Sequence, residues 1–270
     1  MSREAILSLG LTTIVGLSMG MGSLLSFFVK GTNKKFLSLS LSFSAGIMIY
    51  VSFMAILPEG MELIEEHFGE NGSFIALIGF FGGMLITAIV EKLVHKFGGH
   101  VHGHDDHDHD HHHHEENGEH LSKLGLMSAI AIAIHNLPEG LAIFTAGLKD
   151  ISVAIPIAAA VILHNIPLSI AISVPIYYST GSKKKAFLYS LIVGLCQPFG
   201  AIIGYLILSS FFNDLVFGIL FSIVAGIMIF VSLDELLPSS QKYEDHHISV
   251  YGAIAGMIVM ALSISIFHHH

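Results

Sequence analysis

Two short motifs in the middle of the chain carry the side chains best suited to bind a metal ion. The first, His135-Asn136-Leu-Pro-Glu139-Gly, is followed further along the chain by His164-Asn165-Ile-Pro-Leu-Ser. On a helix, His135 and Glu139 lie one turn apart on the same face. Two imidazoles, one carboxylate and two amide oxygens suit a borderline-soft divalent cation such as Zn²⁺ or Fe²⁺. They suit Ca²⁺ or Mg²⁺ poorly, because those ions prefer sites made of oxygen atoms alone.

The chain that holds these motifs is too apolar for a water-soluble protein. It has 270 residues, of which 53% are hydrophobic and 12% charged, and its mean hydropathy is +0.71. Soluble domains carry about 25% charged residues. The formal net charge of −9 argues against a nucleic acid as partner. A single cysteine, Cys196, excludes an intramolecular disulfide and a multi-cysteine zinc site.

Long apolar stretches predict eight transmembrane helices. A helix needs roughly 20 apolar residues to cross a bilayer core of about 30 Å. A membrane β-barrel would instead alternate polar and apolar residues over strands of about ten residues. We therefore expect an all-α, polytopic membrane protein, with residues 1–270 forming a single transmembrane domain. The predicted spans are residues 5–29, 36–58, 74–94, 125–147, 152–178, 186–210, 215–237 and 249–267.

Basic residues predict the orientation of these spans, because lysine and arginine gather on the cytoplasmic side. If the N-terminus lies outside, the inside segments contain ten lysines, and only Arg3 and Lys149 remain outside. Both termini are then expected outside, as is the loop after the second span. This loop would attract cations, although a solvated acidic loop without a role fits equally well. Its acidic residues are Glu59, Glu62, Glu65, Glu66 and Glu70.

An internal repeat relates the two halves of the chain. Residues 45–58 align with residues 225–238, and nine of the fourteen positions are identical. Since the second and seventh spans cross in opposite directions, spans one to three form an inverted repeat with spans six to eight. Span four repeats as span five in the same way. Transporters with such repeats bind their substrate between them near the midplane. Glycines extend the match to the neighbouring spans, with Gly16, Gly22, Gly79 and Gly83 aligning with Gly194, Gly200, Gly252 and Gly256.

Two histidine-rich segments lie outside the predicted spans. Residues 98–123 are polar and of low complexity, so we expect a disordered cytoplasmic loop. Its imidazoles and carboxylates would bind divalent metal loosely. The alternative interpretation is that this segment is a solvated linker without a role in metal binding. Residues 268–270 are three histidines that resemble the remnant of an affinity tag, and we leave them out of functional reasoning.

The motifs together resemble the ZIP family of divalent-metal transporters, in its bacterial ZupT-type branch. The resemblance rests on the eight spans, the histidine-rich loop, the two His-Asn-x-Pro motifs and the sequence at residues 232–238. It implies an inner (plasma) membrane protein that forms homodimers and takes up zinc, iron and related ions into the cytoplasm. It also implies a binuclear metal site between spans four, five and six. His135, Glu139 and His164 match the primary site, and Asn136 and Asn165 match the second, with Glu139 shared.

Three positions depart from the family pattern. Leu168, Gln197 and Ala55 stand where acidic residues are common in the family. Leucine cannot bind a metal, whereas Gln197 offers one neutral oxygen and is a further candidate ligand. The resemblance also suggests Met48 of the second span as a thioether ligand. This match is weak, and packing in the apolar core is the better interpretation of Met48. A divalent ion in a low dielectric needs negative charge to offset its lost hydration. We therefore expect the central site to hold one ion, or to bind weakly.

The leading hypothesis is transport of divalent transition metal, namely zinc, with iron, manganese, cobalt and cadmium as further candidates. Alternating access of one helix group against another is the expected mode, with a channel-like path as the other possibility. No bond-breaking chemistry is implied, so an enzyme is not expected. The alternative is a metal-binding or sensing protein with a transporter fold and little flux, because carboxylates are missing from the site.

Two further interpretations of the central motifs compete with a metal site. In a polar seam between helices, the histidines and asparagines would bond to one another. Two copies of the pattern, one of them with a glutamate, favour a metal site instead. An intramembrane metalloprotease would need His-Glu-x-x-His on one helix. The motif at His135 has neither the second histidine nor the adjacent glutamate.

Overall fold

The computed structural model describes residues 2–27, 34–98, 116–208, 213–243 and 246–268, and this part of the chain is helical, without β-strands. Two of the elements, η1 and η3, are π-helical turns, and η2 is a 3₁₀ turn. In chain order the elements are α1 Arg3–Ser26, α2 Lys34–Val51, η1 Ser52–Ile56, α3 Leu57–Phe68, η2 Gly69–Asn71, α4 Gly72–Gly98, α5 Glu116–Lys149, α6 Ile151–Thr180, α7 Lys183–Leu208, α8 Asp214–Val231, η3 Ser232–Leu236, α9 Leu237–Gln241 and α10 His246–His268.

The prediction of an all-α, polytopic membrane protein is confirmed. Six stretches in the described residues are long and apolar enough to cross a membrane, and one of them, Lys34–Leu93, includes α2 and most of α4. The number of eight crossings stays a prediction. Helix α5 begins at Glu116, within the segment 98–123 for which the sequence predicts a loop. Residues 99–115 of that segment lie outside the described part of the chain.

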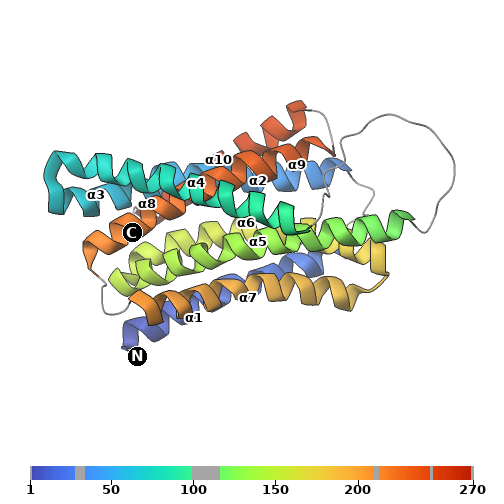
Figure 1. The fold of residues 1–270 in the computed structure, drawn as a ribbon, viewed down its shortest axis with the longest axis horizontal. Helices are drawn as coiled ribbons and strands as arrows, with labels where there is room; N and C mark the ends of the chain where they lie inside the picture. The colour runs from blue at the N-terminus through green and yellow to red at the C-terminus, as the bar shows by residue number, and fades with distance from the viewer. Residues whose placement is uncertain (1, 28–33, 99–115, 209–212, 244–245, 269–270) are drawn as a thin grey trace.

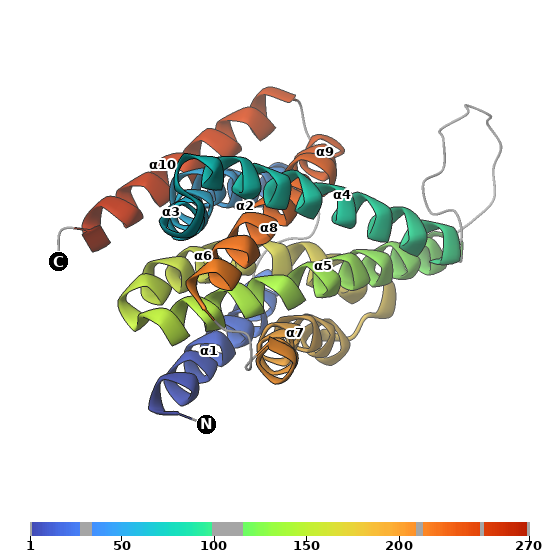
Figure 2. The same ribbon diagram turned by 60° about the vertical axis from the view of Figure 1, so that its left-hand side comes forward.

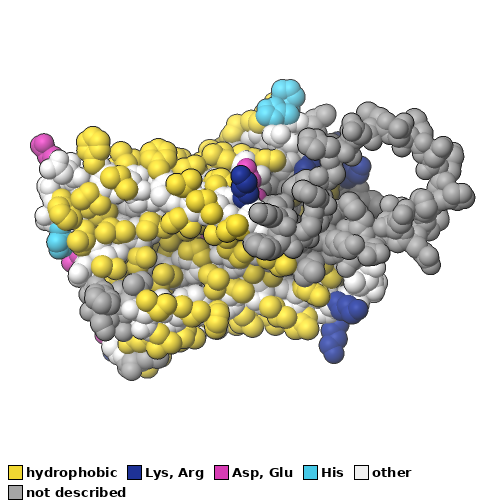
Figure 3. Space-filling model, viewed as in Figure 1, with side chains coloured by type: hydrophobic (Ala, Val, Ile, Leu, Met, Phe, Trp, Pro, Cys, Tyr) yellow, Lys and Arg dark blue, Asp and Glu magenta, His cyan; other side chains and the backbone are white. Residues whose placement is uncertain are grey.

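The helices bury small and polar side chains and expose large apolar ones. On α1, the buried residues include Ser8, Thr12 and Ser23, whereas Ile14 and Met21 are exposed. Two of these buried hydroxyls donate back to carbonyls of their own helix, Ser8 to Glu4 and Thr12 to Ser8, each at 2.8 Å. Exposed apolar side chains cover the middle of the molecule, as Figure 3 shows. This distribution of side chains suits a surface that faces lipid. The helices also satisfy their own backbone hydrogen bonds, as a hydrocarbon solvent requires.

The helices form two groups that lie side by side (Figures 1 and 2). In the first group, α1, α5, α6 and α7 all pack against one another. In the second, α2 packs against α10 and α9, while α8 packs against α4 and α3. The two groups meet chiefly where α2 contacts α6 and where α8 contacts α5. Each group therefore contains helices from both halves of the chain.

The packing repeats between the two halves of the chain, in agreement with the repeat found in the sequence, and the inversion of that repeat stays a prediction. The π-helical turn Ser52–Ile56 recurs in the second half of the chain as Ser232–Leu236, and each is followed by a Leu-Pro helix start. Gly46 of α2 lies against the Ala253 backbone of α10. The equivalent Gly226 of α8 lies against the Phe80 backbone of α4. Both contacts are too close for a side chain, so each glycine sets the distance between its two helices.

A substitution on α4 tests this packing. Gly83 lies against the carbonyl oxygen of Ile223, whereas a methyl group at the adjacent Gly82 would meet nothing within 4 Å. We expect Gly83→Ala to destabilise the protein by about 1–3 kcal/mol, as overpacking does. Gly82→Ala should be neutral or stabilise it by up to about 1 kcal/mol through helix propensity. The midpoint of thermal unfolding in detergent measures both, and equal losses for the two variants would contradict this packing.

The two ends of the helical bundle differ in charge. Helix α3, with its glutamates, lies at the end where both chain termini are found, on the left of Figure 1. Helix α7 begins with three lysines at the opposite end. Near the acidic end, Lys149 forms an ion pair with Glu59 at 3.0 Å. Both side chains are partly exposed, so this pair contributes only about 0–1 kcal/mol to stability.

Candidate metal site

The turn between α5 and α6 brings the two His-Asn motifs together. Asp150 is the only residue between the two helices, and its carboxylate accepts a hydrogen bond from the Ser152 amide at 2.8 Å. His135 precedes Asp150 and His164 follows it, at almost the same distance along the chain. Because the helices return antiparallel from this tight turn, the two histidines reach the same level. Both helices continue through the prolines of the motifs.

His135, Glu139 and His164 form a buried cluster of potential ligands. One side-chain nitrogen or oxygen of each lies within 4.8 Å of the others, and the described residues contain no second cluster of this kind. The three side chains are between 0% and 3% exposed. Nε2 of His164 lies 3.0 Å from Oε1 of Glu139. The cluster is therefore a compact arrangement of two imidazoles and one carboxylate in the protein interior.

Several polar atoms of this cluster are buried without a partner. They are both ring nitrogens of His135 and Nδ1 of His164, whereas Nε2 of His164 and Oε1 of Glu139 face each other as an ion pair. Leaving a buried polar atom unpaired costs about 1–3 kcal/mol. Three such atoms beside a buried imidazole–carboxylate pair indicate a site that binds a ligand. An ion coordinated by both imidazoles and the carboxylate would satisfy several of these atoms at once.

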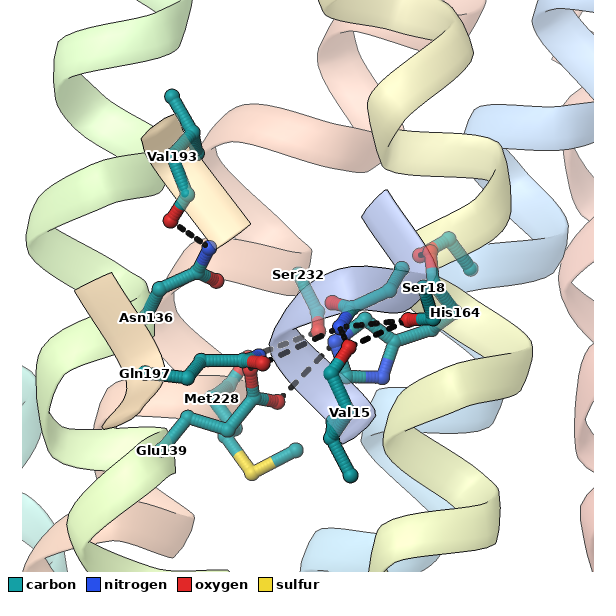
Figure 4. A network of polar contacts seen from close by, with 11 residues as sticks. Val15, Ser18, Asn136, Glu139, His164, Val193, Gln197, Met228 and Ser232 are labelled. Atoms are coloured by element: carbon teal, nitrogen blue, oxygen red, sulfur yellow. Dashed lines mark hydrogen bonds and ion pairs between the residues drawn. The ribbon is translucent and has the colours of Figure 1, made fainter. Parts of the chain in front are cut away.

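The two asparagines are held by backbone carbonyls and leave their own oxygens free. Asn136 donates to the Val193 carbonyl at 2.9 Å, and Asn165 donates to the Val15 carbonyl at 3.2 Å (Figure 4). Val15 and Val193 occupy equivalent positions in the repeat. The side-chain oxygens of both asparagines are buried and unpartnered. In a simple polar seam the asparagines and histidines would bond to one another, and the structure has no such bond between these four described side chains.

Gln197 of α7 lies beside the carboxylate. Its Nε2 donates to Oε2 of Glu139 at 2.6 Å, and its Oε1 accepts from Nδ2 of Asn165 at 3.4 Å. The Gln197 backbone lies directly against Gly140, which has no side chain to keep α7 away. This close approach allows Gln197 to reach Glu139 (Figure 4). All six candidate ligands predicted from sequence thus lie in or next to one buried polar region.

Three other positions singled out in the sequence carry no ligand atom of this cluster. Leu168 is 1% exposed and belongs to the main apolar core. Met48 is also completely buried in that core. Ala55 lies in the π-helical turn η1, and its repeat counterpart Glu235 lies in η3.

The structure adds contacts that the sequence analysis missed. Ser44 of α2 donates to the carbonyl of His164 at 3.2 Å, and Ser18 of α1 lies 3.2 Å from Asn165 Nδ2. The contact from Ser44 joins the second helix group to the cluster. A backbone carbonyl that accepts a hydrogen bond leaves no mark in a sequence. The sequence only indicated that Val15 and Val193 are equivalent, because each directly precedes a glycine matched in the repeat.

Comparisons with known proteins assign the family. Residues 3–264 match the family model described as ZIP zinc transporter. The chain is 49% identical over 268 residues to a zinc transporter ZupT of Streptococcus mutans serotype c, covering 99% of this chain and 100% of the relative. It is 47% identical to a zinc transporter ZupT of Clostridium perfringens, covering 98% and 97%. It is 46% identical to a zinc transporter ZupT of Lysinibacillus sphaericus, covering 98% of each chain. The chain therefore belongs to the ZIP zinc transporter family, a family of membrane proteins that transport divalent metal ions.

Proposed function

We propose that this protein transports zinc into the cytoplasm, and that it holds the ion between His135, Glu139 and His164. The observation that carries this proposal is the buried cluster of these three side chains, in which both ring nitrogens of His135 and Nδ1 of His164 have no hydrogen-bond partner. Two imidazoles and a carboxylate are ligands that Zn²⁺ favours, and they leave further positions for water or an asparagine oxygen. The names of the relatives point to the same ion. Iron, manganese, cobalt and cadmium are candidate substrates by the same ligand chemistry.

The charge of the two ends supports an orientation. Lysines at the start of α7 lie at the end opposite the acidic helix α3. Under the positive-inside rule we expect the lysine end to face the cytoplasm and both termini to lie outside. An acidic outer mouth would concentrate cations before they enter. Location in the inner (plasma) membrane belongs to the same proposal. Homodimer formation is carried over from the family resemblance.

The division into two helix groups supports alternating access. His135, Glu139, His164 and Gln197 all come from the group α1, α5, α6 and α7. The second group covers the site, with α2 in contact with α6 through Ser44 and His164. Because the ligands belong to one group, a movement of this group against the other would expose the ion without dismantling its site.

The alternative of a metal-binding or sensing protein without flux is not favoured. The relatives named above are transporters and match along the whole chain. The missing carboxylates that motivated this alternative leave the triad of His135, Glu139 and His164 intact. Flux measurements separate the two functions directly.

Zinc uptake by purified protein in liposomes loaded with a zinc-responsive dye tests the proposal. We expect saturable uptake that disappears in Glu139→Ala. Empty liposomes and the Cys196→Ser variant serve as controls, because the thiol of Cys196 is partly exposed and donates to the Ile192 carbonyl of its own helix. Zinc binding without uptake by the wild-type protein would favour the sensing alternative.

A further inference from the structure

We propose that Gln197 is a positioning residue that holds Glu139 in a fixed orientation. Its neutral amide also occupies the space next to Glu139 in which a second cation would have to lie. The central site then holds one metal ion. The inference rests on the proposed function only in that the site binds metal. It gives Gln197 a role different from the ligand role that the family resemblance suggests.

The hydrogen bonds fix the direction of the Gln197 amide. Its nitrogen faces Oε2 of Glu139 at 2.6 Å and its oxygen faces the Asn165 amide nitrogen at 3.4 Å. The reverse orientation would place a carbonyl oxygen against a carboxylate oxygen and one NH₂ group against another. Both contacts would be repulsive. The amide hydrogens of Gln197, and not its oxygen, are therefore presented to Glu139.

This contact leaves Glu139 with one oxygen for a metal. Oε2 is engaged by Gln197, whereas Oε1 faces Nε2 of His164, itself a candidate ligand, at 3.0 Å. Hydrogen bonds to the second oxygen orient a ligating carboxylate and tune the metal site. Gln197 therefore directs Oε1 toward the imidazoles.

Asn165 locks Gln197 in this position. Its amide nitrogen contacts Gln197 Oε1, the Val15 carbonyl and the Ser18 hydroxyl. Gln197 is thereby connected to α1 and α6 as well as to Glu139 on α5. The side chains are fully buried, so water does not compete for these bonds. A second cation would have to break this network before it could bind Oε2.

The other half of the repeat supplies no second charge. The counterpart of Glu139 is Leu168, and the counterpart of Gln197 is Met19. Both are apolar and at most 1% exposed. Glu139 is the only carboxylate in the described ligand cluster. Two divalent ions beside one carboxylate would bury three excess positive charges, which a low-dielectric interior strongly disfavours.

The first test counts the ions in the central site. The histidines of residues 100–120 are replaced by serine, so that the histidine-rich segment binds no metal, and the His135→Ala variant in this background measures residual binding. We expect elemental analysis after zinc loading and desalting to give one zinc per chain above that residual. Two zinc ions per chain would overturn the proposal. This count needs no change at Gln197, so it holds even if variants at that position fold poorly.

The second test changes Gln197 itself and uses Co²⁺ as a spectroscopic probe. We expect Gln197→Ala to bind one Co²⁺ with roughly 10- to 100-fold lower affinity, the usual cost of removing an outer-shell partner, and with an altered visible spectrum. Gln197→Glu, which has the same shape but adds a charge, should bind two ions. Cys196→Ser on the same helix should match the wild type.

Three outcomes of the second test would overturn the proposal. An unchanged affinity and spectrum in Gln197→Ala would remove the positioning role. Loss of all binding, as in His135→Ala, would make Gln197 a ligand. A single ion in Gln197→Glu would show that the amide does not decide the number of ions. All readouts measure binding, so a protein that binds one ion without transporting it would contradict the proposed function and leave this inference intact.

Discussion

His164→Ala is expected to weaken zinc binding by roughly 10²–10³-fold and to reduce uptake into liposomes to the level of empty vesicles. His164 is completely buried, and its Nε2 lies 3.0 Å from the Glu139 carboxylate. Its removal takes away one of three protein ligands. By the usual conversion of about 1.4 kcal/mol per tenfold, the expected change in affinity corresponds to about 3–4 kcal/mol of binding free energy.

The matched control for this variant is His67→Ala. His67 is exposed in the last turn of α3, away from the central cluster. Competition with a fluorescent zinc chelator gives the dissociation constants, and the liposome assay gives the flux. Uptake by His164→Ala that matches uptake by His67→Ala would rule out the proposed site.

Leu168→Glu should produce the largest loss of stability in the absence of metal. Leu168 is 1% exposed in the main apolar core, and it is the repeat counterpart of Glu139. A carboxylate introduced there has no described cation to pair with. We expect the unfolding free energy to fall by about 3 kcal/mol or more, the range for an unpaired charge in a core. Saturating zinc should recover part of this loss, because a cation neutralises the added charge.

Leu168→Met is the matched control, because a swap that conserves volume costs less than about 1.5 kcal/mol. The midpoint of thermal unfolding in detergent, measured with a chelator and with excess zinc, separates the two effects. If Leu168→Glu and Leu168→Met unfold at the same temperature in the presence of chelator, the buried position assigned to Leu168 is wrong.

The sequence predicted the features that arise from periodicity and repetition. Eight apolar stretches and the duplicated segment at residues 45–58 and 225–238 were sufficient to predict a helical membrane fold with an inverted repeat. The duplicated His-Asn motif and the family resemblance also placed His135 and His164 in one site, and the structure brings them level through the turn at Asp150. These inferences depend on spacing along the chain, which a sequence records directly.

Contacts that depend on helix rotation and rotamers could not be predicted in the same way. Gln197 looked like a candidate ligand because glutamine carries an oxygen. Its orientation toward Glu139 depends on how closely α7 approaches Gly140 and on the Asn165 amide. The π-helical turns at Ser52–Ile56 and Ser232–Leu236 were also missed, because apolar periodicity carries no signal for one extra residue in a helical turn.

The division into helix groups was a further result that the sequence could not provide. The repeat predicted equivalent helices, but it did not say which helices pack together. In the structure each half contributes to both groups, with α2 against α10 and α8 against α4. Glycines such as Gly46 and Gly226 mark these interfaces. Their partners are backbone atoms distant in the sequence, and so they became identifiable only from the structure.

The most direct test of the account is an anomalous difference map at the zinc absorption edge from crystals of the zinc-loaded protein. The account predicts a peak in the membrane interior within about 2.0–2.2 Å of a His135 nitrogen, a His164 nitrogen and Oε1 of Glu139, the usual zinc–ligand distances. No second peak should lie between Glu139 and Gln197. A central region without zinc, or a peak bound by other side chains, would contradict it.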